Sequence, residues 1–298
     1  MSERKMAERE IGSHFVSVAG TELAYTVEGV GTPLLIVGSS IYYPRTFSQG
    51  LRRSCSLVCA DLPHFVRLDS KFIHTSINFD TYAMCIEAIR LAAGLERVAV
   101  VGHSHHGNVA LEYAKRFPQN VSHVVLICSP PVNIAQTVHA AEQYWALHAS
   151  EERREALEMR RSSLVDKDQL ESLSPADAYV RQYVADAPLY WNDPNYDASW
   201  LWDGMAFDME AIRAFRDLYQ EYELNWDAES LIAPVLIVMG EHDYAVPHTL
   251  WNRVLPSLEN VAFRVFSKSG HTPQLEQPEE FDHLILDWIT ANNRLPLA

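Results

Sequence analysis

The segment at residues 97–115 constrains the fold most strongly, because it joins a strand, a tight turn and a helix. Apolar Val98–Val101 predicts a buried strand, the turn Gly102-His103-Ser104-His105-His106-Gly107 follows, and a helical pattern begins directly after it. Such a turn strains the backbone at Ser104 and projects its Oγ from the carboxyl edge of a sheet. Small residues two positions to either side make the turn sterically feasible. Gly102 fills the first of these positions, whereas His106 stands where glycine is usual.

An acid and a histidine follow in the later part of the chain, each just after a predicted strand. The apolar run at 233–240 predicts a buried parallel strand, and Asp243 lies on the loop that follows it. We prefer Asp243 to Glu241 as the functional acid because it lies further out on that loop. A short strand over 261–266 precedes His271. Serine, aspartate and histidine therefore occur in the chain order of a nucleophile, acid and base triad.

The chemistry of acyl transfer requires these three residue types together. A serine hydroxyl needs a base to remove its proton, and histidine has a pKa suited to that task near neutrality. His271 would activate Ser104 and later protonate the leaving group. Asp243 would fix the tautomer of the imidazole and stabilise the imidazolium. We therefore predict Ser104, Asp243 and His271 as the catalytic residues.

The developing oxyanion needs two backbone N–H donors. His105, the residue after the nucleophile, would supply one of them. The loop after the third strand would supply the other, with Ser39 ranked above Ser40. We expect further substrate contacts from this loop, from the elbow and from a later aromatic segment, at Ser40, His106, Trp191 and Trp202.

Histidines at positions 103, 105 and 106 flank the serine and, with His242, resemble a set of metal ligands. Adjacent residues of such a turn point in divergent directions, however, and no carboxylate pattern completes a zinc or iron site. We therefore predict no metal and no cofactor. We expect His106 to be a packing or pocket residue and not a second base.

Charge and cysteine content limit the partners and the compartment. The chain has 24 Lys and Arg against 39 Asp and Glu, a net charge of −15, which argues against nucleic acid and anionic membranes as partners. The cysteines lack Cys-x-x-Cys spacing and lie in apolar stretches, so we expect buried reduced thiols. The first ten residues are charged, and no apolar run approaches the roughly 20 residues of a membrane span. We expect a cytoplasmic protein whose partner is a small molecule or a short peptide; its oligomeric state is left unassigned.

The hydrophobic periodicity predicts eight strands interleaved with helices. The strands are expected at 15–18, 23–27, 34–37, 56–60, 98–101, 124–127, 233–240 and 261–266. A helix over 79–93 would pack Ile86, Ile89 and Leu91 on the sheet, and another is expected over 278–289.

The strand pattern disappears between about 131 and 228, where helical segments such as 151–162 and 209–218 take over. An insertion after the sixth strand would cover the carboxyl edge of the sheet and shape the pocket. We therefore expect a core built from 1–130 and 229–298 and a helical cap at 131–228.

With these motifs the chain resembles the α/β-hydrolase superfamily, and specifically its proline iminopeptidase-like branch, over roughly residues 14–289. The segments Ile-Tyr-Tyr-Pro-Arg-Thr-Phe (41–47), 102–107 and Tyr-Trp-Asn-Asp-Pro (190–194) resemble a bacterial subgroup of hydrolases with a Ser-x-His-Gly elbow. The resemblance implies an α/β-hydrolase fold: a mostly parallel eight-stranded sheet, flanking helices and an inserted helical cap. Proline iminopeptidases proper carry Gly-Gly-Ser-Trp-Gly-Gly at the elbow and His-Gly-Gly-Pro at the oxyanion loop, and this chain has neither.

The expected reaction is hydrolysis through an acyl-enzyme on Ser104. The substrate is either a peptide with a small N-terminal residue, its ammonium held by Glu221 and Glu223, or a small ester, lactone or thioester. Carbon–carbon bond hydrolysis uses the same triad and stays open. A serine in place of a carboxylate nucleophile disfavours epoxide and halide hydrolysis. A non-catalytic ligand-binding protein on the same scaffold is the alternative from a different class.

Overall fold

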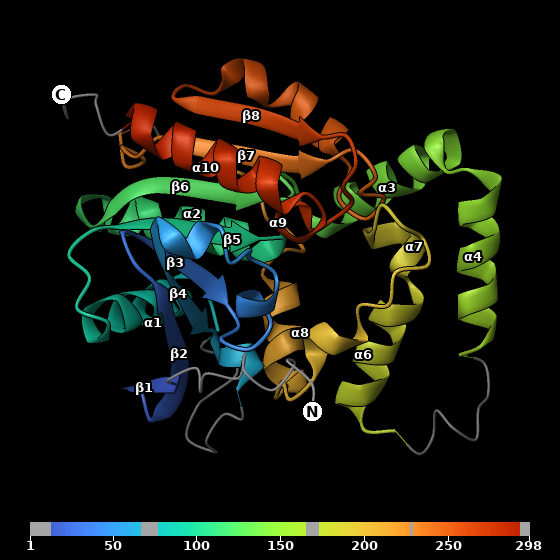
Figure 1. Ribbon diagram of the computed structural model, residues 1–298. Helices are drawn as coiled ribbons and strands as arrows, with labels where there is room; N and C mark the ends of the chain where they lie inside the picture. Colours follow the sequence, from blue (N-terminus) through green and yellow to red (C-terminus); the bar gives the residue numbers. More distant parts are fainter. Residues whose placement is uncertain (1–12, 67–76, 165–172, 227–228, 293–298) are drawn as a thin grey trace, which may run out of the picture.

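The computed structural model describes residues 13–66, 77–164, 173–226 and 229–292, so the charged segment at 1–10 lies outside the described residues. Its centre is an eight-stranded sheet with the order β1-β2-β4-β3-β5-β6-β7-β8 (Figure 1). The first two strands pair antiparallel, β2 pairs antiparallel with β4, and all other pairs are parallel. The strands are β1 (Ser13–Val18), β2 (Thr21–Gly29), β3 (Thr32–Gly38), β4 (Cys55–Asp61), β5 (Val98–His103), β6 (Val121–Ile127), β7 (Val235–Gly240) and β8 (Val261–Phe266).

Both faces of the sheet are covered, because its central strands alternate buried apolar residues on both sides. In β3, Leu35 and Val37 face one core with α1 (Phe79–Ala92) and α2 (His105–Arg116). Leu34 and Ile36 face the other core, with α10 (Pro278–Asn292). Figure 1 shows α10 on the face opposite α1 and α2. This sandwich fixes the carboxyl ends of the parallel strands as a rigid edge.

One packing prediction is wrong. Ile86 and Ile89 are fully buried, but the side chain of Leu91 is 62% exposed. Residues two apart on a helix point to nearly opposite sides, so Leu91 faces away from the sheet that Ile89 contacts. All four cysteines are buried and free, as predicted.

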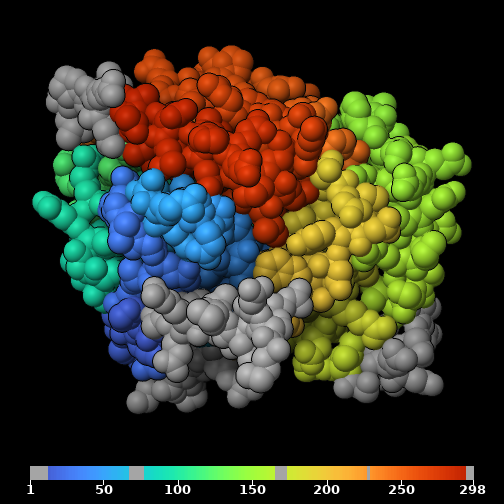
Figure 2. Space-filling model, viewed as in Figure 1, coloured from blue at the N-terminus to red at the C-terminus, as the bar shows by residue number. Residues whose placement is uncertain are grey.

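The long connection between β6 and β7 is helical and lies beyond the carboxyl edge of the sheet (Figure 1). Its helices are α3 (Ile134–His148), α4 (Glu151–Ser162), α6 (Pro175–Ala185), α7 (Ala187–Tyr190) and α8 (Met209–Asp217). In the space-filling view, the yellow part of this insertion lies against the red C-terminal segment that contains α9 (Pro273–Glu276) (Figure 2). The Asn192 N–H donates to Glu276 Oε2 at 2.7 Å across that boundary. The insertion and the sheet therefore enclose the space above the strand ends.

Among the described residues, none of the helices combines the length and the apolar character that crossing a membrane requires.

Candidate active site

Ser104 lies between β5 and α2 with φ 55° and ψ −137°, a strained conformation for a residue with a side chain. The surrounding backbone holds it there, since the Ser104 N–H donates to the Ile127 carbonyl at 2.8 Å and the Gly107 N–H donates to the Ser104 carbonyl at 2.9 Å. A Cβ on Gly102 would lie 2.2 Å from the His106 carbonyl oxygen. A Cβ on Gly107 would lie 1.9 Å from Ser129 Oγ. Both glycines thus let neighbouring backbone and side-chain atoms approach closely at the elbow. The turn needs its second glycine at position 107, so position 106 can hold a histidine.

Asp243 and His271 meet at the same edge, from the loops after β7 and β8. His271 Nδ1 lies 2.6 Å from Asp243 Oδ2, and the Asp243 side chain is fully buried. The other carboxylate oxygen, Oδ1, accepts the N–H groups of Ala245 at 3.0 Å and Val246 at 2.8 Å. The carboxylate is thus fixed from both sides, and it holds a proton on His271 Nδ1, which leaves Nε2 free to accept one. Glu241, the rejected acid, is exposed.

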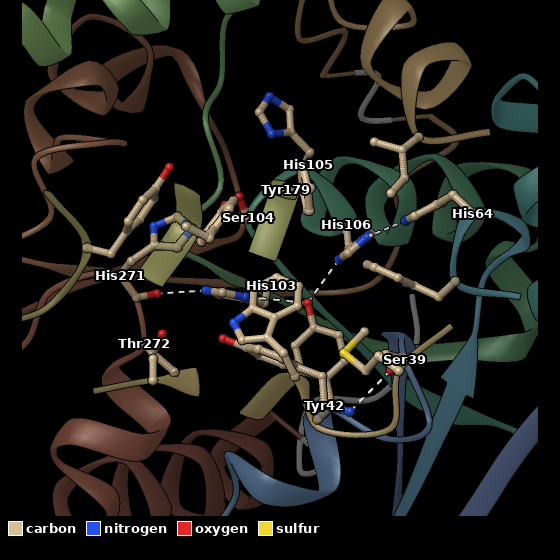
Figure 3. A pocket seen from close by; sticks show the side chains of 18 of the residues that line it. Ser39, Tyr42, His64, His103, Ser104, His105, His106, Tyr179, His271 and Thr272 are labelled. Carbon is tan, nitrogen blue, oxygen red and sulfur yellow. Dashed lines mark hydrogen bonds between the residues drawn. The ribbon is translucent and has the colours of Figure 1, made fainter. Parts of the chain in front are cut away.

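Ser104 and His271 both line one cavity, which brings the three predicted catalytic residues together (Figure 3). The His271 loop is tied to the insertion as well, because the His271 N–H donates to the Tyr190 carbonyl at 2.5 Å. Cys128 Sγ also lies within 4.8 Å of ligand atoms of Asp243 and His271. Burial raises the pKa of this thiol well above its ordinary value, which favours the protonated form.

The two serines of the β3 loop have different surroundings. The Ser40 N–H donates to Asp61 Oδ1 at 2.6 Å, and Ser40 is absent from the cavity lining. Ser39 lines the cavity, and its Oγ accepts the N–H groups of Ile41 and Tyr42, both at 3.1 Å. With the Ser40 N–H engaged, the Ser39 N–H stays the predicted oxyanion donor on this loop. The His105 N–H, in the first turn of α2, stays the predicted second donor, because a helix leaves its first N–H groups unpaired.

A chain of hydrogen bonds runs through three buried histidines beside the elbow (Figure 3). Tyr82 Oη lies 2.8 Å from His64 Nδ1, and His64 Nε2 lies 3.0 Å from His106 Nε2. His106 Nδ1 lies 2.9 Å from Tyr43 Oη, which lies 3.4 Å from His103 Nδ1. Finally, His103 Nε2 lies 2.7 Å from the carbonyl oxygen of His271. We call this set the histidine chain.

The direction of the histidine chain follows from its last member, because a carbonyl can only accept. His103 must donate from Nε2, so in the neutral ring Nδ1 accepts from the Tyr43 hydroxyl. His106 then donates from Nδ1 to Tyr43, and His64 donates from Nε2 to His106, which leaves the Tyr82 hydroxyl to donate to His64 Nδ1. Burial favours neutral rings: it lowers the pKa of His64 and of His103 to about 3, and that of His106 well below 6.5. Every ring nitrogen in the chain is then satisfied without a charge.

The cavity in front of Ser104, which we call the inner chamber, has a volume of about 140 Å³. Aromatic side chains dominate its lining, and among the described residues that line it none is Asp, Glu, Lys or Arg. Of the predicted substrate contacts, His106, Trp191 and Trp202 line it and Ser40 does not. Residues not predicted from the sequence complete the wall: Tyr42, Tyr43, His64, Phe65, Tyr179, Tyr183, Tyr190, Met205, Ile212, Phe215 and Thr272. His64 had one available signal, its place just after the carboxyl end of a predicted strand. Tyr42 and Tyr43 come from the turn after β3, whereas Tyr179, Tyr183 and Tyr190 come from the helices α6 and α7 of the insertion.

Comparison with known proteins agrees with this geometry. The family model of the alpha/beta hydrolase fold matches residues 36–278. The chain therefore belongs to the α/β-hydrolase family.

Three relatives and one solved structure illustrate the range of the family. The chain is 32% identical to the AB hydrolase superfamily protein YclE of Bacillus subtilis (strain 168), covering 91% of this chain and 96% of that protein. It is 24% identical to a 2-hydroxy-6-oxononadienedioate/2-hydroxy-6-oxononatrienedioate hydrolase of Paraburkholderia phymatum, covering 93% and 95%. It is 22% identical to a proline iminopeptidase of Heyndrickxia coagulans, covering 93% and 98%. The structure of an alpha/beta fold family hydrolase from Bacillus anthracis str. Sterne superposes with a TM-score of 0.69 at 17% identity, covering 93% and 98%. The likeness to proline iminopeptidase is thus confined to low identity.

Proposed function

We propose that this protein is a serine hydrolase that cleaves esters with a small, uncharged, apolar acyl group. One observation carries the proposal: the strained Ser104 and the Asp243–His271 pair meet at an aromatic chamber that has no Asp, Glu, Lys or Arg among its described lining residues. An apolar chamber favours an apolar group, because burying an unpaired charge there would be costly.

The reaction would proceed through an acyl-enzyme. His271 Nε2 takes the proton of Ser104 as its Oγ attacks the carbonyl carbon, and the N–H groups of Ser39 and His105 stabilise the oxyanion. His271 then gives that proton to the leaving alcohol. Water, deprotonated by the same imidazole, attacks the acyl-enzyme and releases the acid. No step requires a cofactor. The helical insertion, at 131–228 by our sequence boundaries, would act as the cap that excludes bulk water from these steps.

The surroundings of the chamber favour esters over peptides with a free amino terminus. An ammonium group would need a carboxylate partner, and the two candidates, Glu221 and Glu223, are exposed and outside the chamber lining. An ester places no positive charge in the chamber. The aminopeptidase hypothesis therefore has no support from this site.

The direct test compares p-nitrophenyl butyrate with prolyl and alanyl naphthylamides on the same enzyme. We expect turnover of the ester only, and a loss of at least about 10³-fold in kcat with Ser104→Ala. A fluorophosphonate probe should label the wild type and leave the folded Ser104→Ala variant unlabelled. Turnover of the amides alone would replace the proposal by an aminopeptidase. Absence of probe labelling at Ser104 would favour a ligand-binding protein.

A further inference from the structure

A second cavity adjoins the inner chamber at the nucleophile. It has a volume of about 640 Å³ and shares Ser104, His105 and His271 with the inner chamber. Ile212 and Phe215 of α8 line both cavities, so α8 lies along their boundary. We call this second cavity the outer chamber. A substrate bound at Ser104 would reach into both chambers.

The outer chamber differs from the inner one in carrying charge. Arg213 and Arg216 line it, and their spacing of three residues places them on one face of α8. Asp186 is the only carboxylate among the described residues that line it. That carboxylate is already engaged, since Arg161 Nε donates to its Oδ1 at 2.6 Å and Gln182 Nε2 donates to its Oδ2 at 2.8 Å. The unmatched charge in this chamber is therefore positive, in a chain whose net charge is −15.

The two guanidinium groups have no partner of their own in the described part of the chain: no hydrogen bond or ion pair there engages the side chain of Arg213 or of Arg216. The charge of Arg216 is nevertheless felt at the elbow. Burial, then His271 and then Arg216 lower the pKa of His105 to about 4. An arginine fork presents donors whose geometry matches a carboxylate or a phosphate. Arg213 and Arg216 are exposed to solvent, and they present such donors to the same cavity that Ser104 lines.

We propose that the outer chamber binds an anionic group, a carboxylate or a phosphate, on the leaving-group side of the substrate. The inference rests on the proposed function and deepens it: the substrate is an ester with a small apolar acyl group in the inner chamber and an alcohol that carries a negative charge. The larger chamber suits the leaving group, which must depart before water reaches the acyl-enzyme. The excess of acidic residues elsewhere on the chain does not oppose this binding, because ionic screening confines their effect to about 8–10 Å at physiological salt.

The test uses two esters of the same shape that differ in charge, 4-carboxyphenyl butyrate and 4-carbamoylphenyl butyrate. In the wild type we expect the anionic ester to have the higher kcat/KM after correction for intrinsic reactivity. In the double variant Arg213→Gln/Arg216→Gln we expect this preference to fall by about tenfold or more, mainly through KM. The matched control is Arg264→Gln, which removes the same charge from an exposed position on β8, away from both chambers, and should leave the preference unchanged.

Binding measured without turnover separates this inference from the proposed reaction. The Ser104→Ala variant should bind 4-carboxyphenyl butyrate more tightly than the carbamoyl ester in calorimetry, and adding the two arginine substitutions should abolish the difference. If the two arginine substitutions weaken the binding of a 4-(phosphonomethyl)phenyl ester more than they weaken that of the carboxylate ester, the site is assigned to phosphate. An equal preference in wild type and double variant would overturn the proposal, whatever the enzyme hydrolyses. Failure of all the esters to react, with charge-dependent binding intact, would overturn only the proposed reaction.

Discussion

The buried histidines around Ser104 form two sets, His271 on its own and the three rings of the histidine chain. The two sets differ in what their ring nitrogens contact. His271 has a carboxylate partner, Asp243 Oδ2, at 2.6 Å. The ring nitrogens of His64, His103 and His106 have as hydrogen-bond partners, among the described residues, hydroxyls, a carbonyl and one another. A carboxylate stabilises the imidazolium that a base must become, whereas neutral partners at the same depth oppose protonation. The partner of an imidazole, and not its closeness to the serine, decides which histidine can be the base.

The histidine chain has a different task that suits neutral rings. It connects the turn after β4, helix α2, the oxyanion loop and the loop of the catalytic base through side chains of fixed tautomer. Neutral rings hold this geometry without a buried charge. The predictions below alter one set of histidines while leaving the other in place.

The largest effect is expected from removing the charge that distinguishes His271. Asp243→Asn keeps an oxygen for the N–H groups of Ala245 and Val246 but no longer fixes the productive tautomer. We expect kcat for p-nitrophenyl butyrate to fall by about 10³- to 10⁴-fold, with KM little changed. The matched control, Glu241→Gln, alters an exposed acid two residues earlier and should leave kcat unchanged. Full activity of Asp243→Asn would show that the carboxylate partner of His271 is not what distinguishes it from the histidine chain.

An intermediate effect is expected on stability in acid. The pKa values of His64 and His103 are lowered from 6.5 to about 3 in the folded protein, so below pH 6.5 the unfolded chain binds more protons than the folded one. The stability that these neutral rings contribute is complete above pH 6.5 and is lost as the pH falls toward 3. Each ring should lower the free energy of unfolding by up to about 1.4 kcal/mol per pH unit in that range.

Urea denaturation at pH 7.5, 6.5 and 5.5 measures this slope. His64→Gln should make the acid slope shallower, because one titrating ring is gone. A substitution outside the histidine chain, at exposed His139, should leave the slope as in the wild type. An identical slope in His64→Gln and wild type would show that His64 does not govern acid stability.

The smallest effect is expected from cutting the histidine chain without removing a ring. Tyr43→Phe deletes the hydroxyl between His106 and His103, which leaves ring nitrogens buried without partners and should cost about 1–3 kcal/mol of stability. Because Tyr43 follows the oxyanion loop, we expect kcat to fall about tenfold while KM stays similar.

Tyr82→Phe is the matched control, because it removes a hydroxyl at the far end of the same chain, bonded to His64 at 2.8 Å. It should cost comparable stability but lower kcat less than Tyr43→Phe does. Equal effects of the two variants on kcat would mean that the chain acts on stability alone and does not position the oxyanion loop.

Much of the fold could be predicted because each strand carries its own signal. The sheet of eight strands follows from apolar runs such as 98–101 and 261–266, and the structure extends most of these runs by a residue or two at their ends. The chain order of Ser104, Asp243 and His271 likewise depends only on strands and the loops after them. Local patterns were sufficient for these features because the carboxyl ends of parallel strands must lie at one edge.

The rest depended on contacts that no local pattern encodes. The histidine chain joins His64 to His106, which are 42 positions apart, and Tyr43 to His103, which are 60 apart. Ser39 and Ser40 are neighbours, and the sequence ranks Ser39 only slightly higher; in the structure the carboxylate of Asp61 separates them by occupying the Ser40 N–H. Part of the wall of the inner chamber, including Tyr179, Tyr183 and Phe215, comes from insertion helices, whose spacing relative to the sheet is set by tertiary packing.

The short bond from the His271 N–H to the Tyr190 carbonyl has a mechanical consequence for how substrates enter. The end of α7 is fastened again nearby, where the Tyr244 N–H donates to Leu189 at 2.9 Å and Arg153 Nη1 donates to Pro188 at 2.7 Å. Helix α7 is therefore fixed at this point. A movement of α7 away from the sheet would also pull His271 away from Ser104. We therefore expect substrates to enter without displacing α7, and α8, which lines both chambers, is the insertion helix whose displacement would leave the α7 bonds intact.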